Sequence, residues 1–67
     1  MKIYEKNGLY FIESDYYNII AYGKTEAEAI IEFIIHLANN YNYYKNLNEE
    51  DLIGLGKELK RRYSDKN

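Results

Sequence analysis

The sequence predicts an α+β fold in which a three-stranded antiparallel sheet (β-β-β) over residues 1–24 is followed by two helices. Three observations carry this prediction. Asn7-Gly8 separates two β-prone runs, residues 25–28 (Thr-Glu-Ala-Glu) form a helix-capping pattern, and apolar residues then recur with helical spacing. With 67 residues there is room for one domain, and we expect its helices at about 25–41 and 48–63. Tyr41 and Tyr44 continue the apolar spacing of the first helix, so its extension through these residues is the alternative.

Residues 2–14 predict a β-hairpin. Asn-Gly favours a type I′ turn, because this turn needs positive φ at both central residues. The two-residue loop fixes the register, which pairs Lys6 with Leu9 and Tyr4 with Phe11. One face then carries Ile3, Tyr10 and Ile12, and the other carries Tyr4, Leu9 and Phe11. Both faces are partly apolar, so we expect one to meet a helix and the other to remain open.

The next turn spans residues 15–18, where Asp15 and Asn18 are turn-forming types. Asn18 suits the left-handed conformation. Residues 19–22 form the expected third strand, which Gly23 ends.

The first helix begins at Thr25. The Thr25 hydroxyl should accept a hydrogen bond from the backbone amide of Glu28, and the Glu28 carboxylate should accept one from the backbone amide of Thr25. Its predicted apolar stripe consists of Ile30, Phe33, Ile34 and Leu37, widened by Ala27, Ile31, Ile35 and Ala38. This arc is wider than the ~100° that packing on one surface requires. We therefore expect the helix to contact the sheet and a second body, which is the other helix, another subunit, or both.

For the second helix, Asn48 is the expected cap and residues 49–51 the acidic first turn. Leu52, Leu55, Leu59 and Tyr63 form its apolar stripe. Gly56 lies within that stripe, which predicts a close approach between the helices.

Composition and motifs argue against an enzyme. With no cysteine and one histidine, the chain lacks the thiol and imidazole ligands of common zinc sites, and we expect no metal and no cofactor. Glu32 and His36 are spaced as a general base with its orienting carboxylate, but a solvated helix face accounts for the same spacing. No phosphate-binding glycine loop or nucleophile motif is present.

Hydropathy and charge give expectations about location and partners. No apolar run approaches the ~20 residues of a membrane span, and residues 1–6 lack a signal-peptide core, so we expect a cytoplasmic protein. A net charge of −2 does not favour a general nucleic-acid binder. Two features nevertheless leave RNA binding open: Tyr4 beside Phe11 as a stacking platform, and a basic cluster that could contact phosphates, namely Lys57, Lys60, Arg61 and Arg62.

Nine tyrosines favour a protein-binding role. Tyrosine is enriched at interfaces, because it buries a large area at a low entropic cost. An AT-rich genome is the alternative explanation for their number. The predicted interface residues are Tyr4, Phe11, Tyr16, Tyr17, Ile31, Ile35, Tyr43 and Tyr44. We also expect a homodimer, since so small a domain without disulfides often needs a second subunit.

Residues 7–29 resemble the N-terminal domain of HicB-like antitoxins. The resemblance rests on Gly8 at the start of a strand, Asp15 in the turn, and the helix-opening pattern of Gly23, Thr25, Glu28 and Ala29. It covers about a third of the chain. The family's Leu-Pro-Gly turn is replaced by residues 16–18 (Tyr-Tyr-Asn), and no strand or DNA-binding segment is evident after the first helix.

The resemblance implies a non-catalytic inhibitor that occludes a small toxin or nuclease. Two alternatives remain from the sequence. One is a phage or mobile-element inhibitor of a host defence system, such as an anti-CRISPR protein, and the other is a small RNA-binding protein.

Overall fold

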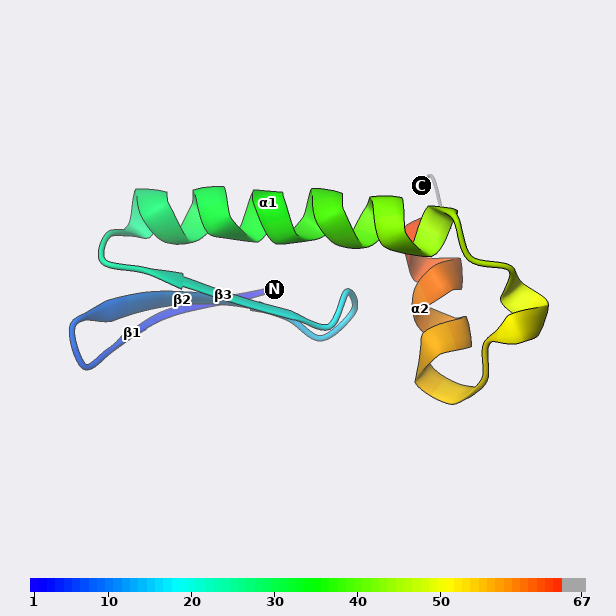
Figure 1. The fold of residues 1–67 in the computed structure, drawn as a ribbon. Helices are drawn as coiled ribbons and strands as arrows, with labels where there is room; N and C mark the ends of the chain where they lie inside the picture. The colour runs from blue at the N-terminus through cyan, green and yellow to red at the C-terminus, as the bar shows by residue number, and fades with distance from the viewer. Residues whose placement is uncertain (65–67) are drawn as a thin grey trace.

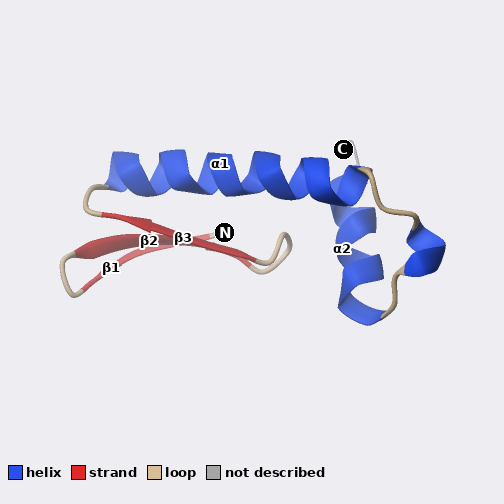
Figure 2. Cartoon of the chain, in the orientation of Figure 1, coloured by secondary structure: helices blue, strands red, loops and turns tan. Residues whose placement is uncertain are grey.

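The computed structural model describes residues 1–64, in which three strands precede two α-helices. Strands β1 (Lys2–Lys6), β2 (Leu9–Ser14) and β3 (Ile19–Gly23) form an antiparallel sheet with β2 in the centre. Helix α1 (Glu26–Lys45) lies along one face of the sheet (Figure 1). A short 3-10 turn, η1 (Glu49–Asp51), leads to helix α2 (Gly54–Ser64) at the far end of α1 (Figure 2). The predicted α+β class and element order are confirmed.

The β1–β2 hairpin has the predicted turn and register. Asn7 and Gly8 have φ of 54° and 81°, as a type I′ turn requires. Lys6 pairs with Leu9 and Tyr4 with Phe11. The face that carries Tyr10 and Ile12 meets α1, so the opposite face is the open one.

The turn between β2 and β3 also forms as expected. Asn18 takes φ of 56°, and its amide donates to the Asp15 carbonyl at 3.3 Å. The buried hydroxyl of Ser14 accepts the Tyr17 amide at 3.2 Å. Local hydrogen bonding thus fixes the direction in which β3 returns along the sheet.

Helix α1 begins at the predicted cap and ends later than predicted. The Thr25 hydroxyl accepts the Glu28 amide at 3.1 Å, but the Glu28 carboxylate accepts the Lys24 amide at 2.9 Å, not that of Thr25. The helix continues to Lys45, four residues beyond the predicted end at 41. Its last turn is stabilised by tertiary packing, because the ring of Tyr44 stacks on that of Tyr63 at 5.3 Å.

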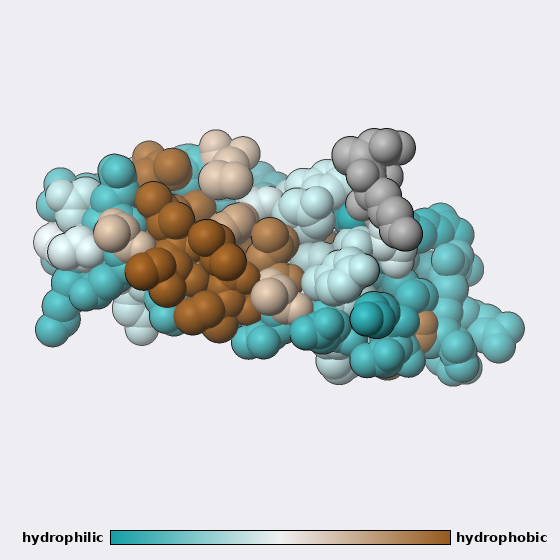
Figure 3. Space-filling view, turned by 90° about the horizontal axis from the view of Figure 1, so that it is seen from above, coloured by the Kyte–Doolittle hydropathy of each residue, from teal (hydrophilic) through white to brown (hydrophobic). Residues whose placement is uncertain are grey.

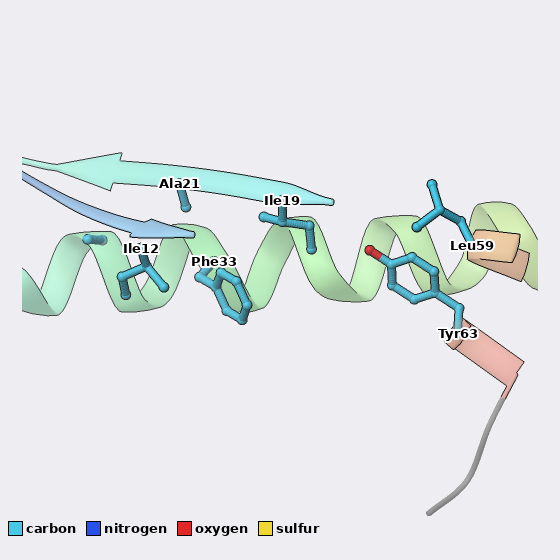
Figure 4. Close-up of a cluster of buried hydrophobic side chains, with 7 residues drawn as sticks. Ile12, Ile19, Ala21, Phe33, Leu59 and Tyr63 are labelled. Carbon is cyan, nitrogen blue, oxygen red and sulfur yellow. The ribbon is translucent and has the colours of Figure 1, made fainter. Parts of the chain in front are cut away.

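The apolar stripe predicted for α1 meets the sheet with only part of its width, because the helix is rotated so that Phe33 points inward and the isoleucines do not. Ala29 and Phe33 are the buried residues, whereas Ile30 and Ile34 remain 41% and 57% exposed. Figure 4 shows Phe33 in the core with Ile12, Ile19 and Ala21. Small residues decide this rotation, since Ala29 is fully buried where α1 passes over Gly23.

Replacing Gly23 by alanine is expected to destabilise the fold by about 1–3 kcal/mol. A methyl group there would lie 2.5 Å from Cβ of Glu28 and 2.7 Å from the amide nitrogen of Ala29, so β3 and α1 would have to separate. Urea unfolding followed by circular dichroism would measure the loss.

The control is Gly56→Ala, which adds the same methyl group inside α2, where the nearest neighbour is Leu52 at 3.7 Å. It should leave stability unchanged or raise it by up to about 1 kcal/mol. Equal effects of the two substitutions would contradict the close packing at Gly23.

The predicted second helix at 48–63 was wrong at its start, because α2 begins at Gly54. Asn48 makes no side-chain cap, and residues 49–51 form η1 instead. Leu52 is extended and Gly54 has φ of 59°, so the chain turns sharply before α2. The close helix approach expected at Gly56 is also absent from the described residues, since its nearest neighbour is Leu52, which precedes α2.

Helix α2 packs on the part of α1 that extends beyond the sheet (Figure 1). Leu59 and Tyr63 are its buried residues. The Tyr63 hydroxyl donates to the Tyr17 carbonyl at 2.7 Å and accepts from the Asn40 amide at 3.1 Å. Tyr63 therefore joins α2 to both α1 and the β2–β3 turn.

Candidate functional site

The open face of the sheet carries three aromatic rings in a row, one from each strand. The Tyr4 and Phe11 rings are stacked at 5.2 Å, and the Phe11 and Tyr22 rings lie 5.9 Å apart. The pairings of Tyr4 with Phe11 and of Phe11 with Tyr22 place these side chains on the same face. We call Tyr4, Phe11 and Tyr22 the aromatic row.

Apolar and charged groups border the aromatic row. Ile20 and Tyr22 are 64% and 60% exposed. The Lys2 ammonium lies 5.5 Å from the centroid of the Tyr4 ring, and the Tyr4 hydroxyl donates to the Glu13 carboxylate. That hydrogen bond raises the pKa of Tyr4 above its usual value, with smaller contributions from desolvation and the Glu13 charge. The open face thus combines aromatic rings that pack against one another with polar groups at one end.

The outer side of α1 forms a second exposed apolar surface. Four isoleucines on it are between 41% and 57% exposed, namely Ile30, Ile31, Ile34 and Ile35. Figure 3, which looks down on α1, shows a brown apolar patch over the first half of the helix. Apolar patches of this kind mark sites of association in small proteins.

The predicted interface residues lie in separate places. Tyr4 and Phe11 belong to the open sheet face, and Ile31 and Ile35 to the outer side of α1. The other four lie near the junction with α2: Tyr16 and Tyr17 in the β2–β3 turn, and Tyr43 and Tyr44 in the last turns of α1.

The junction tyrosines differ in what they offer a partner. Tyr17 and Tyr44 pack on Tyr63, at 4.8 Å and 5.3 Å between ring centroids, so they stabilise the fold. Tyr43 is 62% exposed and Tyr16 48% exposed. A hollow of about 650 Å³ lies along α1, where Leu37 and Tyr41 line it together with Tyr17 of the β2–β3 turn and Tyr63 of α2.

Three of the four basic residues proposed for phosphate contact have partners within the chain. Lys60 donates to the Tyr44 carbonyl at 3.0 Å, at the C-terminal end of α1. Arg61 pairs with Glu49 at 2.7 Å, and its hydrogen bond lowers the pKa of Glu49. Arg62 donates to the Tyr16 carbonyl at 2.9 Å and lies over the Tyr16 ring. These three residues connect α2 to the end of α1, to η1 and to the β2–β3 turn. Lys57 makes no such hydrogen bond in the described residues.

Glu32 and His36, the spaced pair that resembled a general base with its orienter, are both exposed. They line an open hollow of about 590 Å³ beside Ile20 and Tyr22. Within residues 1–64, no group of three or more histidine or acidic side chains is placed to hold a metal ion. In the same residues, no helix combines the length and apolar character needed to cross a bilayer.

Two members of the open sheet face were missed from the sequence, Ile20 and Tyr22. The signal was present, because alternate residues of β3 point to one face and Phe11 pairs with Tyr22. The register of the third strand depended on the length of the second turn, which the hairpin signal does not fix.

Comparisons with protein-family models, with curated proteins and with solved structures found no match to this chain.

Proposed function

We propose that this chain is a non-catalytic binding module that occludes a partner protein with the open face of its sheet. The observation that carries the proposal is the aromatic row, an uncovered surface built from all three strands. Interface centres are enriched in tyrosine, and adjacent rings lose little conformational freedom on binding.

The resemblance of residues 7–29 to HicB-like antitoxins adds a class of partner, a toxin or another nuclease. An inhibitor of a host defence system is an alternative with the same surface and a different target. Both forms of the proposal need only occlusion of the partner, so neither assigns a catalytic residue to the chain.

The test is capture of the partner by the immobilised full-length chain from the host in which it is encoded, with identification by mass spectrometry and reconstitution from purified proteins. Tyr22→Ala is expected to weaken the reconstituted complex about 30-fold or more, as loss of an aromatic hot-spot residue does. Tyr22 is 60% exposed at an edge strand, so the fold should tolerate the change.

Tyr43→Ala is the matched control, because the proposal confines the contact to the open sheet face and so leaves Tyr43, although predicted as an interface residue, outside it. Tyr43 is equally exposed, at 62%, but lies near the end of α1 and outside the sheet. The control should bind as the unaltered chain does. Failure to reconstitute any complex, or equal affinities for the two variants, would contradict the proposal.

Single-stranded RNA is a second candidate ligand for the same face. The specific observation is the Lys2 ammonium over the Tyr4 ring, beside rings on which bases could stack. Fluorescence anisotropy with a labelled RNA oligonucleotide at low salt separates the two candidates. RNA binding that Tyr22→Ala abolishes and added salt weakens would favour this second function.

A further inference from the structure

The exposed apolar residues of α1 follow the spacing of a coiled-coil contact. Ala27, Ile31, Ile34 and Ala38 are separated by four, three and four residues, which aligns them along one side of a helix. All four are exposed, whereas the sheet-facing Ala29 and Phe33 are buried. We call these four residues the α1 seam, and Ile30 and Ile35 lie on its two flanks.

The seam has mirror symmetry in residue type. About the midpoint between residues 32 and 33, Ile31 mirrors Ile34, the flanking Ile30 mirrors Ile35, and Ala27 mirrors Ala38. A two-fold interface between antiparallel helices requires this relation, because residue i of one copy meets residue j of the other and j meets i. We propose that two copies of the chain associate through the α1 seam as an antiparallel dimer.

The seam fits a second copy better than an unrelated partner. None of the six seam and flank residues is charged, so pairing the surface with itself brings no like charges together. Mirror mates also match in size, since alanine meets alanine near the ends and isoleucine meets isoleucine in the middle. A partner of different sequence would not require this symmetry.

This inference uses a different surface from the proposed partner site. The seam and the open sheet face lie on different sides of α1, because the sheet meets α1 through Ala29 and Phe33. An antiparallel dimer would therefore leave two sheet faces accessible and could bind two partners.

Cysteine cross-linking tests the dimer and its direction, and the chain contains no cysteine of its own. Ala27→Cys and Ala38→Cys are prepared separately, then mixed and mildly oxidised. The antiparallel seam brings residue 27 of one copy beside residue 38 of the other. Two copies of residue 27 would lie about 16 Å apart along the axis, beyond disulfide reach.

Cross-linked dimer is expected in the mixture and not in either variant alone. Equal cross-linking of each variant alone would show a parallel or different pairing and overturn the proposal. No cross-link in the mixture would also overturn it. Alanine sites on an exposed helix face should accept cysteine without loss of the fold.

Sedimentation equilibrium provides the second measurement. The unaltered chain is expected at twice its mass of 8.0 kDa, and Ile34→Lys should raise the dissociation constant about 100-fold or more. Asn39→Lys adds the same charge to an exposed position off the seam and should leave the dimer intact. A monomer mass for the unaltered chain up to about millimolar concentration, or equal effects of the two lysines, would overturn the proposal.

Discussion

Phe33→Ala is expected to remove most of the stability of the chain. Phe33 is 7% exposed and lies between α1 and the sheet, beside Ile12, Ile19 and Ala21. Truncating a buried phenylalanine costs about 3–5 kcal/mol, because contacts are lost and a cavity remains. Small domains have a free energy of unfolding of about 5 kcal/mol or somewhat more, so the substitution would remove most of it.

Urea unfolding at a fixed chain concentration would measure the effect, since association would add to the apparent stability. Ile53→Ala is the control, because Ile53 is 89% exposed and should change stability by less than about 0.5 kcal/mol. A folded Phe33→Ala chain with an unchanged urea midpoint would show that the core is not where Figure 4 places it.

Tyr63→Ala is expected to detach α2 while the sheet and the first part of α1 remain folded. Tyr63 is 5% exposed, and its ring packs on Tyr17 and Tyr44. Its removal should cost about 3–5 kcal/mol, by the same cavity argument as for Phe33. Hydrogen exchange should show that amides of α2 lose protection before those of β2 and β3. Simultaneous loss of protection in all elements would contradict a separate docking of α2.

Tyr63→Phe isolates the hydroxyl from the ring. It leaves the Tyr17 carbonyl and the Asn40 amide without their shared partner, at a cost of about 1–3 kcal/mol. Tyr43→Phe is the control, since that side chain is 62% exposed.

Titration of the Tyr63 hydroxyl is also expected to make the stability depend on pH in the alkaline range. Burial raises the pKa of Tyr63 above its usual value of about 10, with a smaller opposing effect from the Asn40 hydrogen bond. As the pH rises above 10, the Tyr63 hydroxyl loses its proton in the unfolded state before it does so in the folded state, and this favours unfolding. The contribution of the protonated hydroxyl to stability is therefore complete below pH 10 and declines as the pH rises through the folded-state pKa. Stability of the unaltered chain should therefore fall more steeply above pH 10 than that of Tyr63→Phe.

Local sequence signals predicted the hairpin, its register and the helix start, because each depends on neighbouring residues. Asn7 and Gly8 take the positive φ that their turn requires, and Asn18 takes the left-handed conformation expected of it. Thr25 caps α1 as predicted. The start of α2 could not be predicted in this way, because the acidic run 49–51 fits an α-helix start and a 3-10 turn equally well.

The surface candidates were predicted in part. Tyr4, Phe11, Ile31 and Ile35 are on exposed faces or their borders, and their periodicity in a strand or helix identified them. Tyr17 and Tyr44 instead pack against the core, because Tyr63 arrives from a helix far along the chain. No local pattern carries information about that distant partner.

The sequence by itself determined the elements: three strands joined by two tight turns, and a capped helix that follows them. Only the tertiary structure decided which side of α1 is buried. Apolar periodicity centred that side on the isoleucines, but packing depends on how closely backbones approach. Gly23, Ala21 and Ala29 permit the closest approach, so α1 turns these small residues inward and presents its isoleucines to the solvent.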